Sequence, residues 1–243
     1  MSESLRLSIN FSTVRNLICT ASILALASVQ LPAQEEFPAE AGPMPAEVQI
    51  DASRIFVFAD KTGLGHQHAV EASLLQSTLI LGAEKDAGKL VFDMKSFNAD
   101  TERARKRLGL KGTTDEATRT AVNENMHSAA VLDVAKYPTA TFEISSAKAT
   151  GQVTTSGNPT YLLEGNFTLH GTTKPQTIIV HAEQVRGWLH VRGGFAINQS
   201  VFGIKPYTKA LGAIGVADEL KIYGELFVVP TEYVNLDEIP SRP

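Results

Sequence analysis

The chain has 243 residues, of which 43% are hydrophobic and 20% are charged, a balance typical of a globular protein with a sizeable core. Its formal net charge of -4 argues against a nucleic-acid-binding protein, because such proteins need a basic surface. The single cysteine, Cys19, lies near the N-terminus, so a disulfide framework and a cysteine-based metal site or nucleophile are excluded for the rest of the chain.

The N-terminal residues have the pattern of an export signal. Arg6 and Arg15 supply positive charge, residues 17–29 are apolar with small residues, and Ala33 offers one of several cleavage positions. We therefore expect residues 1–33 to be a signal peptide and the mature protein to be periplasmic or secreted. An uncleaved membrane anchor is the alternative, although the apolar stretch is short for a bilayer span.

Composition divides the remainder into three parts. Residues 34–47 are rich in Pro, Ala and Glu without periodicity, which is typical of a flexible linker. Residues 48–230 carry the strand pattern and form the predicted domain. The polar residues 231–243 are predicted to be a C-terminal tail.

Eight segments of the predicted domain alternate apolar and polar residues with the period of a β-strand. In the first of them, Ile55 and Val57 share one face while Phe56 and Phe58 share the other. The predicted strands cover residues 50–60, 66–81, 89–94, 139–150, 160–170, 177–185, 188–198 and 218–229.

Turn-forming residues separate most of these strands, so consecutive strands are expected to pair antiparallel in an up-and-down order. Eight such strands can close into a barrel that encloses one small ligand. The fold class is therefore predicted to be mainly β, an eight-stranded antiparallel barrel. A two-sheet sandwich is the alternative that the pattern leaves open.

The interval between the third and fourth predicted strands, residues 101–136, has a helical pattern. Cap-type residues around Asp115 precede a run that places Val122 and Met126 on one stripe. Residues 102–108 are predicted to form a second, shorter helix. Helices inserted here are expected to cover one end or one flank of the barrel.

Four elements follow one another in an informative order. They are Asp51-Ala-Ser-Arg-Ile-Phe-Val-Phe58, Tyr137-Pro-Thr-Ala-Thr-Phe142, Gly165-Asn-Phe-Thr-Leu-His-Gly-Thr-Thr-Lys174, and Gly194-Phe195 with Phe202-Gly203-Ile204. Together they resemble the YceI family of exported lipid-binding proteins over residues 48–229. The resemblance implies a lipocalin-like barrel that binds an isoprenoid lipid or a quinone in an elongated internal tunnel.

The segment Gly63-Leu-Gly-His-Gln-His68 departs from that family, many members of which have a single histidine here. In an extended chain His66 and His68 face the same way, so both imidazoles could bind one metal ion such as zinc or copper. We favour the alternative that they form hydrogen bonds at the barrel mouth or contact the headgroup of a ligand. A third metal ligand would have to be a carboxylate or one of His127, His170, His181 and His190.

The expected function is to bind or carry a long apolar ligand such as a polyisoprenoid or a quinone, with apolar burial as the driving force. His66, His68 and His170 are candidates for a polar mouth, although the ring of His170 is better explained as fixing the turn that follows it. The alternatives are a periplasmic metal-binding protein that uses His66 and His68, or an interaction module without a ligand. The candidate apolar contacts are Ile55, Val57, Tyr161, Leu163, Phe167, Leu169, Phe195 and Phe202.

No Gly-x-Ser-x-Gly, His-Glu-x-x-His or phosphate-loop motif is present in the sequence, so we expect a binding protein rather than an enzyme. The expected partner is an apolar small molecule, and no cofactor beyond such a ligand is predicted. The basic run Arg103-Ala-Arg-Lys-Arg107 suits transient contact with anionic lipid headgroups, while a solvated helix face is the commoner explanation. The pattern leaves the oligomeric state open, a dimer included.

Overall fold

The computed structural model describes residues 45–231. The predicted signal peptide, residues 34–44 of the predicted linker and residues 232–243 of the predicted tail lie outside the described residues. Within the described part of the chain, Ala46 already contacts the barrel, since its backbone N–H donates to the carbonyl oxygen of Val229 at 2.9 Å. No helix in the described part of the chain is both long and apolar enough to cross a membrane.

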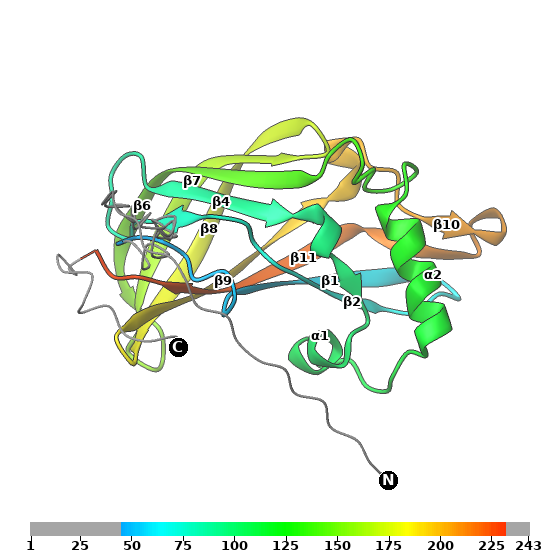
Figure 1. Ribbon diagram of the computed structural model, residues 1–243, viewed down its shortest axis with the longest axis horizontal. Helices are drawn as coiled ribbons and strands as arrows, with labels where there is room; N and C mark the ends of the chain where they lie inside the picture. Colours follow the sequence, from blue (N-terminus) through cyan, green and yellow to red (C-terminus); the bar gives the residue numbers. More distant parts are fainter. Residues whose placement is uncertain (1–44, 232–243) are drawn as a thin grey trace, which may run out of the picture. The chain divides into compact units, whose positions relative to one another are not determined.

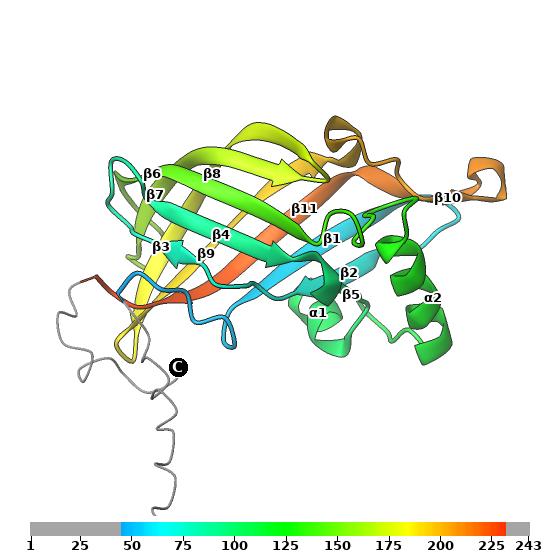
Figure 2. The same cartoon turned by 45° about the horizontal axis from the view of Figure 1, so that its top comes forward.

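One curled antiparallel sheet forms the body of the domain (Figures 1 and 2). Its spatial order is β3-β4-β6-β7-β8-β9-β11-β1-β2-β5, and β10 pairs with β11 outside this path. The strands are β1 (Arg54–Gly63), β2 (His68–Ala72), β3 (Thr78–Leu79), β4 (Gly88–Asp93), β5 (Asn98–Ala99), β6 (Thr139–Val153), β7 (Pro159–Leu169), β8 (Thr172–Val185), β9 (Trp188–Asn198), β10 (Thr208–Lys209) and β11 (Ile214–Val228).

Two α-helices and three 3-10 helices join these strands. The α-helices are α1 (Glu102–Arg107) and α2 (Glu116–His127), and the 3-10 helices are η1 (Met94–Ser96), η2 (Gln199–Phe202) and η3 (Ala210–Gly212). Both α-helices lie between β4 and β6, which confirms the predicted insertion. Each begins at a capping side chain: Thr101 accepts a hydrogen bond from the N–H of Ala104, and Asp115 accepts one from the N–H of Thr118.

The mainly β class and the up-and-down antiparallel order are confirmed, but the prediction of eight strands is wrong in number. The predicted strand 66–81 is broken into β2 and β3. The break lies at Ser77, whose hydroxyl donates to the carbonyl of Leu75 and accepts from the N–H of Val91. The N–H of Val91 is therefore bonded to a side chain instead of to the backbone of a neighbouring strand. The strands β5 and β10 have two residues each, too few to produce an alternating pattern.

The two edges of the curled sheet meet over a short stretch only. Leu74 bridges to Phe92 in β4, and the backbone N–H of Leu75 donates to the carbonyl of Val91 at 2.8 Å. Beyond this contact β5 extends the edge at β2, and the side chain of Asn123 in α2 accepts from the N–H of Ala99 in β5 at 2.8 Å. α2 is thereby fixed at the end of the sheet where the two edges separate (Figure 2).

Alternation along β1 decides which side chains face inward. Ile55, Val57 and Ala59 belong to the interior, as the period of two predicts. Phe56 points outward and is buried against Ala104 of α1 in a separate small cluster. The short helix α1 therefore covers the outer face of β1 and β2, while α2 lies at the end of the barrel.

Candidate ligand-binding site

An apolar cavity of about 170 Å³ lies within the end of the barrel next to α2. Val122 and Met126, on the predicted stripe of α2, form part of its wall, together with inward residues of the sheet. Six of the predicted site residues also line it: Ile55, Val57, His68, Phe167, Leu169 and Phe195. A few polar groups are placed among these apolar walls, namely His68, Asn125, Gln199 and the phenol of Tyr207.

A second, smaller cavity of about 50 Å³ continues the interior beyond the first. The predicted site residue Leu163 lines this second cavity rather than the first. Four residues line both cavities and therefore form the partition between them: Ile55, Phe92, Phe195 and Ile222.

Phe167 is the centre of the aromatic cluster at this partition. Its ring meets those of Phe92, Phe195 and Phe202 edge to face, with centroid distances of 5.9, 5.5 and 5.6 Å. Edge-to-face pairs at such distances are attractive beyond their buried area. Phe202 thus supports the wall from behind and does not line the cavity.

Two further predicted residues lie away from both cavities. Tyr161 packs against the core from a half-buried position. His170 occupies the turn between β7 and β8 with a φ of 50°, and its ring centroid lies 4.4 Å from that of Tyr137. This placement agrees with the interpretation that the ring fixes the turn.

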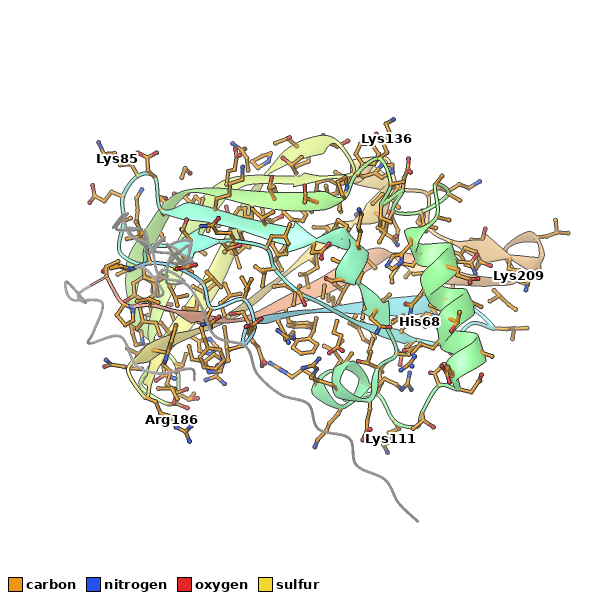
Figure 3. All side chains as sticks on the ribbon, in the orientation of Figure 1. His68, Lys85, Lys111, Lys136, Arg186 and Lys209 are labelled. Carbon is orange, nitrogen blue, oxygen red and sulfur yellow. The ribbon has the colours of Figure 1, made fainter. Side chains whose placement is uncertain are left out.

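His68, labelled in Figure 3, is the first residue of β2 and lies in the wall of the larger cavity, and His66 precedes it by two positions. The ring centroids of His66 and His68 are 4.5 Å apart, as their spacing of two residues in an extended chain predicts. His68 lines the cavity, whereas the exposed His66 lines a depression on the outer surface. Partial burial of the His66 ring, and next the neighbouring His68, lower the pKa of His66.

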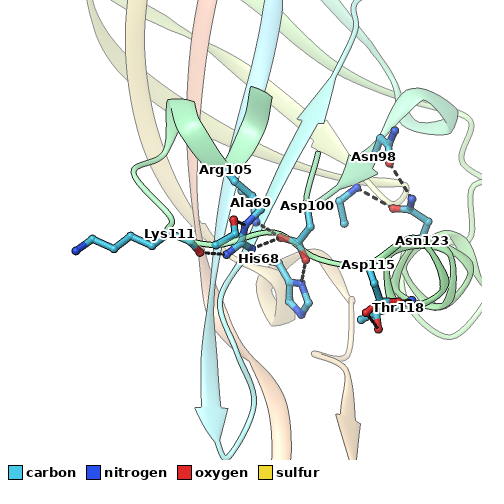
Figure 4. A network of polar contacts seen from close by, with 11 residues as sticks. His68, Ala69, Asn98, Asp100, Arg105, Lys111, Asp115, Thr118 and Asn123 are labelled. Atoms are coloured by element: carbon cyan, nitrogen blue, oxygen red, sulfur yellow. Dashed lines mark hydrogen bonds and ion pairs between the residues drawn. The ribbon is translucent and has the colours of Figure 1, made fainter. Parts of the chain in front are cut away.

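Asp100 holds the ring of His68 and was not predicted (Figure 4). Its side chain is 0% exposed, and Oδ2 lies 2.7 Å from Nδ1 of His68. Oδ1 accepts from the N–H of Ala69 at 3.1 Å and from Nη1 of Arg105 at 3.0 Å. Burial alone would raise the pKa of Asp100, but the hydrogen bonds from these three donors outweigh it, so the pKa lies below its ordinary value.

The basic run of α1 is largely engaged in ion pairs of the domain. Arg103 pairs with Glu71 at 2.6 Å, Arg105 with Asp100, and Arg107 with Glu225. Three of its four cations are therefore held by carboxylates of the barrel and of the loop before α1.

Comparison with known proteins supports the resemblance found in the sequence. A family model described as "YceI-like domain" matches residues 47–226. A UPF0312 protein of Azotobacter vinelandii is 33% identical over 142 residues, which cover 56% of this chain and 67% of the relative. A UPF0312 protein of Pseudomonas putida strain W619 is 31% identical over 169 residues, which cover 67% of this chain and 78% of the relative.

A solved structure has a similar fold. It is a polyisoprenoid binding domain from Saccharophagus degradans implicated in plant cell wall breakdown, with a TM-score of 0.52 and 14% identity, and the match covers 77% of this chain and 99% of that domain. Because the family model spans most of the described barrel and well over half of the chain, the chain belongs to the YceI family.

Proposed function

We propose that this protein binds an apolar small molecule in the cavity beside α2, and that the molecule is an isoprenoid lipid or a quinone. The observation that carries the proposal is the wall of the cavity, which is apolar except for His68 and a few other polar groups. Ligand sites commonly combine such walls with a few orienting polar groups. The similar fold of the Saccharophagus polyisoprenoid binding domain supports the choice of ligand class.

The volume of the cavity restricts which part of a long ligand it accepts. An apolar cavity of roughly 150 Å³ holds one benzene-sized ring. The larger cavity, at about 170 Å³, therefore suits a quinone ring or the end of an isoprenoid chain. A longer chain would extend toward the second cavity by displacing the partition that contains Phe195. Such binding is passive, and we propose a carrier or sequestering role rather than catalysis.

Filling the cavity tests this function. The Val57→Trp variant is expected to weaken binding of a short prenyl alcohol or a short-chain quinone at least about tenfold, which corresponds to about 1.4 kcal/mol, because the indole occupies the ligand's space. Native mass spectrometry of the ligand titration measures this loss. The matched control is Val153→Trp, which adds the same atoms at an exposed position of β6. Equal binding by both variants would place the ligand elsewhere.

We also propose that the protein is exported and that residues 1–33 are removed. The charged start and the following apolar stretch support this proposal. Cell fractionation followed by N-terminal sequencing tests it: a mature chain that begins near residue 34 outside the cytoplasm is expected, and an intact Met1 in the cytoplasm would contradict it.

Contact with a membrane is the natural source or destination of such a ligand, and we propose that two adjoining hairpin tips make it. Leu64, between β1 and β2, is 85% exposed, and Leu211 in η3 is fully exposed. The tips adjoin because the N–H of Leu64 donates to the carbonyl of Ala213 at 2.9 Å. Exposed Lys61 and Lys209 flank them, and Lys209 marks this end in Figure 3. Apolar tips flanked by cations suit an anionic bilayer surface.

A paired charge variant tests the membrane proposal. The double variant Leu64→Asp/Leu211→Asp is expected to reduce flotation with phosphatidylglycerol vesicles more than tenfold, because burying each leucine contributes about 1.5–3 kcal/mol. The matched control, Val153→Asp/Ile179→Asp, changes two exposed apolar residues of β6 and β8. Similar losses in both double variants would show that general charge, and not these tips, decides flotation.

A further inference from the structure

We infer that His66 and His68 form a binding site for one divalent transition-metal ion, in which Asp100 orients the imidazole of His68. The ligand atoms that His66, His68 and Asp100 offer all lie within 4.8 Å of one another. Imidazole nitrogens suit ions such as Zn²⁺, Cu²⁺, Fe²⁺ and Ni²⁺. His68 lies in the wall of the cavity and His66 outside it. Metal binding can therefore be tested separately from binding of the apolar ligand.

The hydrogen bond between His68 and Asp100 is the feature that favours a metal ligand over an ordinary surface histidine. The ionised Asp100 can only accept, so Nδ1 of His68 carries the proton at 2.7 Å from Oδ2. In the neutral imidazole the lone pair then lies on Nε2, the nitrogen that can bind a metal. A carboxylate that holds the second nitrogen of a histidine is the usual outer partner at metal sites.

Asp100 is itself fixed in this orienting position. Hydrogen bonds from the N–H of Ala69 and from Arg105 hold Oδ1, so a shift of the carboxylate toward the metal would break several bonds at once (Figure 4). Arg105 is held in turn by the carbonyl oxygens of Lys111 and Gly112. Three of its five N–H donors make these bonds, and its charge is paired with that of Asp100.

The segment that carries His66 is also tied to the barrel. Leu64 donates its N–H to Ala213, and a Cβ at Gly65 would lie only 3.0 Å from the carbonyl oxygen of Gly215, so this position needs a glycine or a shift of the backbone. The intervening Gln67 turns away and donates to Asp60 at 3.1 Å. The two imidazoles are thus presented together before any ion binds, which lowers the ordering cost of binding.

The position of the pair gives the ion access from both sides of the wall. His66 lines an open depression on the surface, and His68 lines the apolar cavity. Two histidines fill only part of a tetrahedral or octahedral shell, so the other positions remain for water or for an oxygen of a ligand headgroup. Lys61, Arg105 and Lys111 border the same depression and oppose a cation there. Asp100 pairs with Arg105, and Asp115 offsets part of the charge of the two lysines.

Titration of the untagged protein with Zn²⁺, followed by calorimetry, tests the inference. We expect one Zn²⁺ per chain and shifts of the His66 and His68 imidazole signals in NMR spectra. The exposed His66→Ala variant should lose at least about tenfold in affinity, since even outer partners of metal ligands contribute 10–100-fold. The matched control is His181→Ala on β8, with unchanged affinity expected. No Zn²⁺ uptake by the wild type, or equal uptake by His66→Ala, would overturn the site.

The orienting role of Asp100 has its own variant. Asp100→Asn removes the charge, and its single amide oxygen can accept from His68 or from Ala69 and Arg105 but not from all three, so Zn²⁺ affinity is expected to fall by about 10–100-fold without being abolished. Near-UV circular dichroism checks that the variant is folded. Unchanged affinity in the folded variant would refute the orienting role of Asp100, and the result for His66→Ala would still decide the site itself.

Discussion

Replacing Phe167 by alanine is expected to lower the free energy of unfolding by about 3–5 kcal/mol, the usual cost of truncating a buried phenylalanine. Phe167 is 4% exposed and its ring meets three other phenylalanine rings. The substitution therefore removes three edge-to-face contacts and leaves a void beside a cavity that already exists. Urea denaturation followed by circular dichroism measures the loss.

The same substitution on the outer face provides the control. Phe58→Ala, in β1, removes a half-buried ring that lies near the ammonium group of Lys221, so a much smaller loss is expected. Comparable losses of unfolding free energy in both variants would mean that the edge-to-face contacts of Phe167 add no stability beyond that of an ordinary phenylalanine on a strand.

Phe167→Ala also tests how the two cavities are related. Without the ring of Phe167, its neighbours Phe92 and Phe195 lose a support, and both of these residues form part of the partition. The folded variant is therefore expected to accept longer prenyl chains than the wild type in native mass spectrometry. An unchanged preference for chain length would indicate that the partition is held by Ile55 and Ile222 instead.

Periodicity predicted the faces of the strands well, because the pleat fixes alternation whatever the topology. Ile55 and Val57, which the alternation placed together on one face, line the interior, and the cap-type residues around Asp115 correctly located the start of α2. Periodicity gave no information on where space remains between inward side chains. Leu163 and Phe167 share one face of β7, yet they line different cavities.

Long-range contacts account for what the sequence did not reveal. Asp100 follows the two-residue strand β5, is separated from His68 by 32 positions, and has a φ of 55°, a conformation rare for residues other than glycine. No local pattern joins such a residue to a histidine in another strand. The predicted strand 66–81 failed for a similar reason, because the partner of the Ser77 hydroxyl is the backbone of β4.

Replacing Asp100 by alanine is expected to cost about 3–5 kcal/mol of unfolding free energy, as for other buried ion pairs that lose one partner. The side chain of Arg105 is only 13% exposed, so its charge would remain in place without the carboxylate. The N–H of Ala69 would lose its acceptor as well, in a residue that is 0% exposed. Thermal and urea denaturation at neutral pH measure the loss.

Asp218→Ala is the matched control for this prediction. Asp218 also accepts two hydrogen bonds, from the N–H and the hydroxyl of Ser200, at 2.8 and 2.6 Å. These bonds lie at the surface, where water replaces the lost carboxylate, so a much smaller loss of stability is expected. A large loss for Asp100→Ala together with a small one for Asp218→Ala would attribute the cost to burial. Equal losses would mean that the hydrogen bonds alone decide it, and that Arg105 reaches water when its partner is removed.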